Sequence, residues 1–238
     1  MKKAYVTLTS NDLFVPGAVA AIKSLRMTKT QYPILCMVSE EVSEENLDIL
    51  REAGCETILV DKIHSEVSGE DGDRFEVGKN WLTFTKLNVF NMTDYDKIVY
   101  IDADCVVLKN IDEMFDFPTL SGYVLAHTGE LEAGVLVLQP SEEIFNEILS
   151  FINKENWTNH DQSLLNWFFR NHKDNFHHLS NDYHFCHKLY HNQDPMLLNK
   201  GLVKIIEFNG YKPWIPSRWK DGEDLFYRLW NYAYNFSE

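Results

Sequence analysis

The segment Lys97-Ile-Val-Tyr-Ile-Asp-Ala-Asp-Cys-Val-Val-Leu108 is an apolar run interrupted by two carboxylates. Its first part, residues 97–101, is an unbroken run without in-out alternation, which predicts a central strand that is covered on both faces. Asp102 and Asp104 would then lie at the carboxyl edge of this strand, where open α/β sheets bind ligands. Two other Asp-x-Asp triplets, at residues 71–73 and 94–96, follow no comparable run. Position therefore singles out Asp102 and Asp104 as a candidate site.

Apolar runs and helical patterns alternate along the chain, as is typical of a parallel sheet flanked by helices. The other apolar runs are residues 4–9, 34–38, 57–60, 122–126, 134–138 and 203–208, and the helical patterns cover residues 17–26, 44–53, 141–152 and 161–172. No linker divides the chain, so we expect one α/β domain over residues 1–238 with a Rossmann-like, mostly parallel central sheet.

Composition and charge exclude several classes of protein. Apolar residues make up 45% and charged residues 24%, which is typical of a globular protein and not of a disordered or coiled-coil chain. The net charge of -14 argues against a nucleic-acid partner. No apolar run approaches the roughly 20 residues of a membrane span, so we expect no integral membrane protein. The absence of a signal-peptide pattern and of CxxC spacings predicts a cytoplasmic location.

The two carboxylates suit a divalent cation. Residues i and i+2 of an extended strand point to the same side, so Asp102 and Asp104 could together hold Mg²⁺ or Mn²⁺. The cation would reverse the local charge and let an acidic protein bind a pyrophosphate. The alternative interpretation is a pair of solvated acidic residues at a strand end.

Several segments, in order along the chain, resemble the retaining glycosyltransferases of family 8, and within that family its glycogenin-like members. These segments are residues 4–17, 84–87, 100–108, 133–138, 160–166 and 208–214. The resemblance implies a single-domain type-A glycosyltransferase fold, a UDP-sugar donor and a bound Mn²⁺ or Mg²⁺. It also implies a nucleotide-binding half (1–108) and a sugar- and acceptor-binding half (109–215). The aromatic residues of the tail (216–238) lead us to expect that it packs back on the domain, and the alternative is an apolar face for a partner or a membrane.

The resemblance assigns a role to each matching residue. It implies that uridine contacts Leu8, Thr9, Asn11 and Phe14, that Asp102 and Asp104 hold the cation, and that Gly210 and Lys212 close over the phosphates. On the donor side it also implies Ala103, Lys86 and, in a less regular match, Arg74. Lys86, like Lys212, would serve catalysis by offsetting the charge that accumulates on UDP as the sugar leaves. The sugar would lie near Glu132, Ala133 and Gly134, with Asp161 and Gln162 below the anomeric carbon. For Asp161, the local alternative is a helix N-cap.

Two residues depart from the family pattern. Glu207 replaces the usual histidine before Phe-x-Gly, and its oxygen could still bind a hard cation as a third metal ligand. Glu132 replaces the usual asparagine, and a carboxylate accepts hydrogen bonds from sugar hydroxyls but cannot donate them. We therefore expect that the chain still binds a metal, and that its preferred sugar need not be the commonest sugar of the family.

We predict a metal-dependent retaining glycosyltransferase that moves a hexose, from UDP-glucose or UDP-galactose, to a hydroxyl of a glycan, protein or small molecule. The alternatives are a non-catalytic UDP-sugar-binding protein and a self-glucosylating primer enzyme that uses Tyr190. A sugar nucleotidyltransferase is disfavoured, because no glycine-rich basic loop follows the first strand. Three interpretations remain for a cluster of histidines: the side chains pack or face solvent, they contribute to acceptor binding, or they bind structural zinc. The cluster comprises the histidines at 177, 178, 184, 187 and 191, with Cys186 among them. A homodimer is also left open.

Overall fold

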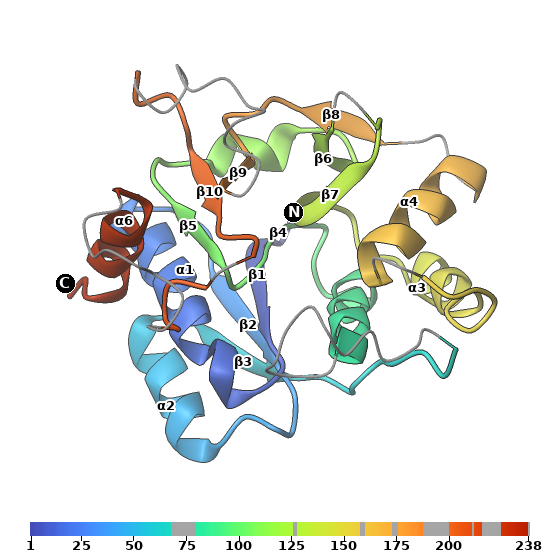
Figure 1. Cartoon of the computed structure of the whole chain (residues 1–238), viewed down its shortest axis with the longest axis horizontal. Coiled ribbons are helices and arrows are strands. Elements are labelled where there is room, and N and C mark those ends of the chain that lie inside the picture. Colours follow the sequence, from blue (N-terminus) through green and yellow to red (C-terminus); the bar gives the residue numbers. More distant parts are fainter. Residues whose placement is uncertain are drawn as a thin grey trace.

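A seven-stranded sheet forms the centre of the computed structural model, in the order β3-β2-β1-β4-β7-β6-β8 (Figure 1). Its strands are β1 (Lys3–Thr9), β2 (Ile34–Val38), β3 (Glu56–Leu59), β4 (Lys97–Ile101), β6 (Ser121–Val124), β7 (Leu131–Leu138) and β8 (His177–Leu179). Neighbouring strands are parallel, except that β7 is antiparallel to β4 and β6. The predicted mostly parallel α/β sheet is confirmed. The structure describes residues 1–67, 80–125, 128–157, 160–172, 176–187, 200–210, 212–215 and 225–237.

Helices cover both faces of this sheet, and their ends follow local sequence signals. The α-helices are α1 (Val15–Met27), α2 (Glu44–Ala53), α3 (Glu142–Leu149), α4 (His160–His172) and α6 (Leu225–Tyr234), and the 3-10 helices are η1 (Asp12–Phe14), η2 (Asn80–Asn91) and η3 (Asp112–Asp116). Ser141 caps α3 by accepting a hydrogen bond from the Ile144 amide at 3.3 Å. Gly54 ends α2 with a φ of 104°, a conformation that favours glycine.

The core lies in two layers, one on each face of the sheet. Tyr5 of β1 and Val99 of β4 belong to the cluster that packs under α1 and α2. The alternate residues, such as Val6 and Tyr100, belong to the opposite cluster with η2, α3 and α4. Figure 1 shows α1 and α2 on one side of the sheet and α3 and α4 on the other. Burial on both faces explains why the strands are continuous apolar runs.

The apolar segment 97–108 does not form one continuous strand. It divides at Asp102 into β4 and β5 (Cys105–Val107), and β5 belongs to a second sheet in the order β5-β10-β9. The other two strands of this sheet are β9 (Phe185–Cys186) and β10 (Ile205–Glu207). The small sheet packs with α6 through an apolar cluster that includes Phe226 and Trp230. This part of the aromatic tail therefore packs back on the fold, as predicted.

Several predicted boundaries move in the structure. The strand predicted at 57–60 lies one residue earlier, as β3. The strand predicted at 134–138 begins at Leu131, so β7 also contains Glu132. The strand predicted at 203–208 is shorter, and it is β10. Among the helices in the described ranges, none has both the length and the apolar character of a membrane span.

Candidate active site

The chain turns at the carboxyl end of β4, and this turn carries Asp102 and Asp104. The Cys105 amide donates to the Asp102 carbonyl at 3.1 Å, and the Asp102 amide donates to the Gly134 carbonyl at 2.8 Å. The prediction that both aspartates lie on an extended strand is therefore wrong, because the chain leaves the central sheet here to enter the small one. Their carboxylates nevertheless remain close, since ligand oxygens of both lie within 4.8 Å of each other.

Glu207 brings a third carboxylate to this turn. It ends β10, which pairs with β5, and the next amide, of Phe208, donates to the Asp104 carbonyl at 2.8 Å. Ligand oxygens of Asp102, Asp104 and Glu207 all lie within 4.8 Å of one another. Three carboxylate oxygens at this spacing fit a hard divalent cation such as Mn²⁺ or Mg²⁺.

Lys86 links the carboxylate cluster to α4. Its ammonium lies 3.0 Å from Asp102 Oδ2 and 2.9 Å from Asp161 Oδ2, and it also donates to the Ala133 carbonyl at 3.2 Å. Burial by itself would lower the pKa of Lys86, but the Asp102 and Asp161 carboxylates outweigh burial and raise it. Lys86 therefore stays charged, and Asp161 faces this charge rather than serving only as a helix cap.

Lys212 is the second buried ammonium, and it pairs with Asp104. It also donates to the Phe208 carbonyl at 3.1 Å. Burial lowers its pKa, but the Asp104 carboxylate overcomes this effect, and the net shift is upward. Gly210, in the same loop, has a φ of 95°, which favours glycine. The structure thus places the predicted phosphate-closing residues next to the Asp-x-Asp turn.

The carboxylates repel one another even with both lysines present. Burial raises the pKa of Asp102 from 3.8 to about 7, against the opposing effect of Lys86, and the charges of Asp104 and Glu207 add to the rise. Burial and the neighbouring carboxylates thus both disfavour the ionised form of Asp102. A bound divalent cation would favour that form.

The predicted sugar-side residues lie on β7 and α4. Gln162 accepts a hydrogen bond from the Ala133 amide at 3.3 Å. Burial raises the pKa of Glu132, and the nearby Glu207 charge adds to that rise. Gly134 cannot carry a side chain without displacement, because a Cβ there would lie 2.8 Å from Glu207 Oε1. Asp161, Gln162 and the 132–134 segment are therefore brought to the same edge of the sheet as the carboxylates.

The predicted uridine residues follow the carboxyl end of β1. Thr9 is buried, and its hydroxyl donates to the Asn11 carbonyl at 3.0 Å. The Asn11 side chain accepts from the Leu13 amide at 3.1 Å and so caps η1. Leu8 is partly buried against the core cluster under η2. These contacts hold the loop in one conformation, although Asn11 uses its side-chain oxygen within the loop.

Phe14 and Trp214 join this loop to the Asp-x-Asp turn. Their rings make an edge contact with centroids 5.9 Å apart. A Cβ on Gly17 would lie 2.5 Å from the Trp214 ring and 2.7 Å from the Ala103 carbonyl. The first turn of α1 therefore approaches both segments closely only because residue 17 is glycine.

Four residues with contacts at this site were not assigned a role from the sequence, except as members of the histidine cluster. Tyr100 donates to Asp102 Oδ1 at 2.6 Å, and Asn166 accepts from the Leu131 amide at 2.7 Å. His184 and Cys186 both contact Glu207. Tyr100 and Asn166 lie in segments that carry the family resemblance, and His184 and Cys186 were noted as part of the histidine cluster.

The predicted histidine cluster is divided in the structure. His177 and His178 are exposed on β8, whereas His184 is buried beside Glu207. His187 packs against the Phe226 ring at 4.6 Å between centroids. Three of the residues singled out above, Arg74, Tyr190 and His191, lie outside the described residues.

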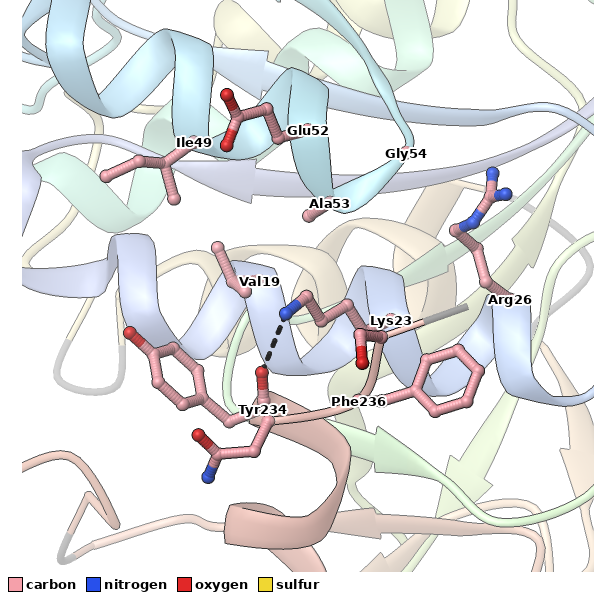
Figure 2. A pocket seen from close by; sticks show the side chains of 11 residues that line it. Val19, Lys23, Arg26, Ile49, Glu52, Ala53, Gly54, Tyr234 and Phe236 are labelled. Atoms are coloured by element: carbon pink, nitrogen blue, oxygen red, sulfur yellow. Dashed lines mark hydrogen bonds between the residues drawn. The ribbon is translucent and has the colours of Figure 1, made fainter.

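A separate cavity of about 520 Å³ lies between α1, α2 and the C-terminal segment (Figure 2). Lys23 crosses it and donates to the Tyr234 carbonyl at 2.9 Å. Val19, Ile49 and Phe236 supply apolar walls. The predicted donor, metal and sugar residues in the described ranges are not among those that line it. The candidate active site is therefore at the carboxylate turn and not at this cavity.

The sheet order and the carboxylate turn define a type-A glycosyltransferase fold. The glycosyltransferase GlyE of Streptococcus pneumoniae has this fold with a TM-score of 0.72 at 19% identity, over 99% of this chain and 62% of that chain. An active-site mutant of LgtC also gives a TM-score of 0.72, at 18% identity, over 97% of this chain and 94% of that chain. Residues 5–133 match the family described as Glycosyl transferase family 8, and the chain belongs to this family.

Curated relatives agree with this assignment and include glycogenins. Inositol phosphorylceramide glucuronosyltransferase 1 of Arabidopsis thaliana is 35% identical over 71% of this chain and 30% of its own length. Glycogenin-1 of Caenorhabditis elegans is 32% identical over 90% of this chain and 51% of its own length. Human glycogenin-1 is 34% identical over 70% of this chain and 48% of its own length. The matches thus span between 30% and 51% of the length of these relatives.

Proposed function

We propose that the chain is a metal-dependent retaining glycosyltransferase that moves a hexose from a UDP-sugar to a hydroxyl of a glycan, protein or small molecule. The observation that carries the proposal is the cluster of Asp102, Asp104 and Glu207, whose ligand oxygens lie within 4.8 Å of one another at the carboxyl end of β4. Lys86 and Lys212 pair with its two aspartates. A cation held by these carboxylates, together with the two ammonium groups, would let an acidic protein bind a pyrophosphate.

The proposed roles divide the cluster between binding and charge stabilisation. Asp102, Asp104 and Glu207 would hold Mn²⁺ or Mg²⁺. When bound, the cation supplies positive charge to the diphosphate of the donor. Lys212 would offset negative charge that accumulates on UDP as the sugar leaves. Lys86 holds Asp161 and Asp102 in fixed positions, at 2.9 and 3.0 Å.

On the sugar side, we place the anomeric carbon near Asp161 and Gln162. A carboxylate or an amide at this position can support retention, either as a nucleophile or by shielding a short-lived oxocarbenium ion. Gln162 is oriented by the Ala133 amide, at 3.3 Å. On the other side of the turn, the loop from Leu8 to Phe14 would receive the uridine.

Glu132 bears on the identity of the sugar. One relative of Arabidopsis thaliana is named a putative UDP-glucuronate:xylan alpha-glucuronosyltransferase, 30% identical over 92% of this chain. A glucuronosyl group carries a carboxylate, which the crowded negative charge of Glu132 and Glu207 would repel. We therefore favour a neutral hexose, from UDP-glucose or UDP-galactose. A solved galactosyltransferase, LgtC with donor and acceptor sugar analogs, shares the fold with a TM-score of 0.66.

The test combines binding and turnover. Thermal stabilisation by UDP-glucose, UDP-galactose, UDP-glucuronate and UDP-N-acetylglucosamine is measured with Mn²⁺ and with EDTA, since a ligand of the native state raises the melting temperature. Release of UDP is measured with the same donors. We expect one neutral hexose donor to give the largest effect and to require Mn²⁺.

Matched variants make the test specific. Asp102→Asn and Asp104→Asn should abolish metal-dependent turnover, whereas Asp94→Asn, in an exposed Asp-x-Asp triplet, should leave it unchanged. Unaltered turnover in both site variants would refute the proposal. UDP binding that is independent of metal, without release of UDP from any donor, would instead indicate a non-catalytic UDP-sugar-binding protein.

A further inference from the structure

The small sheet places three side chains in a row beside the Asp-x-Asp turn. Glu207 of β10 is the register partner of Cys186 of β9 on one side and of Cys105 of β5 on the other. Register partners on neighbouring strands project to the same face of a sheet. His184 precedes Cys186 by two residues and is brought to the same carboxylate. Glu207 therefore has neighbours from two strands that the main sheet does not contain.

His184, directly before β9, and Cys186 of β9 both contact one oxygen of Glu207. His184 Nε2 lies 2.8 Å from Glu207 Oε2, and the Cys186 thiol donates to the same oxygen at 3.2 Å. His184 and Cys186 are 0% exposed, and Glu207 is 7% exposed. The carboxylate therefore cannot turn freely, because rotation would break two buried hydrogen bonds.

The opposite oxygen is confined by backbone. A Cβ on Gly134 would lie 2.8 Å from Glu207 Oε1 and 3.2 Å from His184 Nε2. The carboxylate and the imidazole thus both pack against the bare Gly134 backbone. With Oε2 occupied by two donors, Oε1 is the oxygen of Glu207 with the greater capacity to accept a further interaction.

We infer that His184 and Cys186 are positioning residues that fix the Glu207 carboxylate for cation binding. This inference rests on the proposed function, in which Glu207 is the third ligand. Carboxylates that bind metals are themselves commonly held by hydrogen bonds from outside the ligand set. In the family pattern a histidine is expected where this chain has Glu207. Here an imidazole is present, but it contacts the ligand from the residue directly before β9.

The alternative is that His184, Cys186 and Glu207 hold a thiophilic cation themselves, since their ligand atoms lie within 4.8 Å of one another. The hydrogen bonding of His184 argues against this. Its Nδ1 atom is buried and has no hydrogen-bond partner in the described part of the chain. A cation at Nε2 would move the proton to Nδ1 and leave a buried donor unpaired, which is costly. With the proton on Nε2, both His184 and Cys186 donate a hydrogen bond to Glu207 Oε2.

The experiment measures Mn²⁺ binding directly, by the electron paramagnetic resonance signal of the free ion. His184→Gln keeps a donor near the position of Nε2, whereas His184→Leu removes it. Cys186→Ser keeps a donor, whereas Cys186→Ala removes it. His177→Gln, at an exposed histidine on β8, is the control. Thermal melting verifies that each variant is folded.

We expect His184→Leu to weaken Mn²⁺ binding about 10- to 100-fold, the loss typical of removing such a partner. The Gln and Ser variants and the control should bind Mn²⁺ nearly as the unmodified chain does, and Cys186→Ala should show a smaller loss than His184→Leu. If His184→Leu does not fold, the Cys186 pair provides the same comparison with a smaller change in volume.

Three results would overturn the inference, and they are distinguishable. Unchanged Mn²⁺ affinity in His184→Leu and Cys186→Ala would refute positioning but leave the proposed function intact. No Mn²⁺ binding by the unmodified chain would refute both. The third test loads Co²⁺ alone: an intense near-ultraviolet sulfur-to-metal band that Cys186→Ser removes would make Cys186 a ligand instead of a positioning residue.

Discussion

Replacing Asp102 by asparagine should make the stability of the metal-free protein depend less on pH in neutral and mildly alkaline solution, while removing its response to Mn²⁺. Asp102 is held among like charges, and burial raises its pKa from 3.8 to about 7. Ionising it in the folded state is therefore unfavourable, and asparagine removes this cost. A site built to bind a cation is commonly less stable without it, so stability and function oppose each other here.

The size of the effect follows from linkage. A folded-state pKa above the unfolded value means that the folded state binds more protons, so stability is lost as pH rises from 3.8 to about 7. Each pH unit within this window lowers the free energy of unfolding of the wild-type protein by about 1.4 kcal/mol at most. Between about pH 5 and about pH 8, the wild-type protein should lose up to about 3 kcal/mol relative to Asp102→Asn. For a chain of this length, this corresponds to a melting-temperature difference of about 6 to 12 °C.

The assay is urea unfolding in EDTA at several pH values, followed by the same series with Mn²⁺. The Asp102 side chain is 24% exposed, so screening by water will make the pH-dependent loss of stability smaller than the upper value of about 3 kcal/mol. The loss of the Lys86 hydrogen bond lowers the stability of the variant at every pH. Only the pH dependence of the difference in free energy of unfolding between the two proteins therefore reports the ionisation of Asp102. Asp94→Asn, an exposed site, should show no such change. The reasoning would be refuted if the free energy of unfolding of Asp102→Asn, relative to that of the wild type, stayed constant or fell as pH rises.

The remaining predictions concern single contacts. Lys86→Met should destabilise the metal-free protein by up to about 3 to 5 kcal/mol in chemical denaturation at neutral pH, because the buried Asp161 and the partly buried Asp102 lose their shared cation; an effect below about 1 kcal/mol would mean that these pairs behave as exposed ones. Gly134→Ala should weaken Mn²⁺ binding in calorimetry, because a Cβ would lie 2.8 Å from Glu207 Oε1 and displace it; unaltered affinity would show that Glu207 is not a ligand. Asn166→Ala should cost about 2 to 3 kcal/mol in urea unfolding, since it leaves both backbone groups of Leu131 unpaired; a near-zero change would indicate that water replaces them.

Much of the central sheet was predictable because its strands are buried on both faces. The boundaries of β2 and α2 were predicted residue by residue, since Ile34–Val38 is entirely apolar and Gly54 ends α2. The start of β7 was predicted three residues late. Glu132 is polar and only partly buried, and it interrupted the apolar pattern that marks a strand.

The small sheet was not predicted as a separate sheet, although β10 lies within the strand predicted at 203–208 and β5 within the run 97–108. Its third strand, Phe185–Cys186, is only two residues long. A strand of this length shows no alternation that separates it from a loop. As a result, the contact between His184 and Glu207 could not be found from the sequence, although both residues had been noted separately.

The sequence by itself determined the class of fold, the edge of the sheet that carries the site, and the residue types available there. Local patterns suffice for these features, because burial and turn formation depend on neighbouring residues. Tertiary structure decided which polar side chains meet: Lys86 with Asp161, Lys212 with Asp104, and His184 with Glu207. These partners come from segments far apart in the chain, and only the packing of two sheets and α4 around one turn brings these side chains within reach of each other.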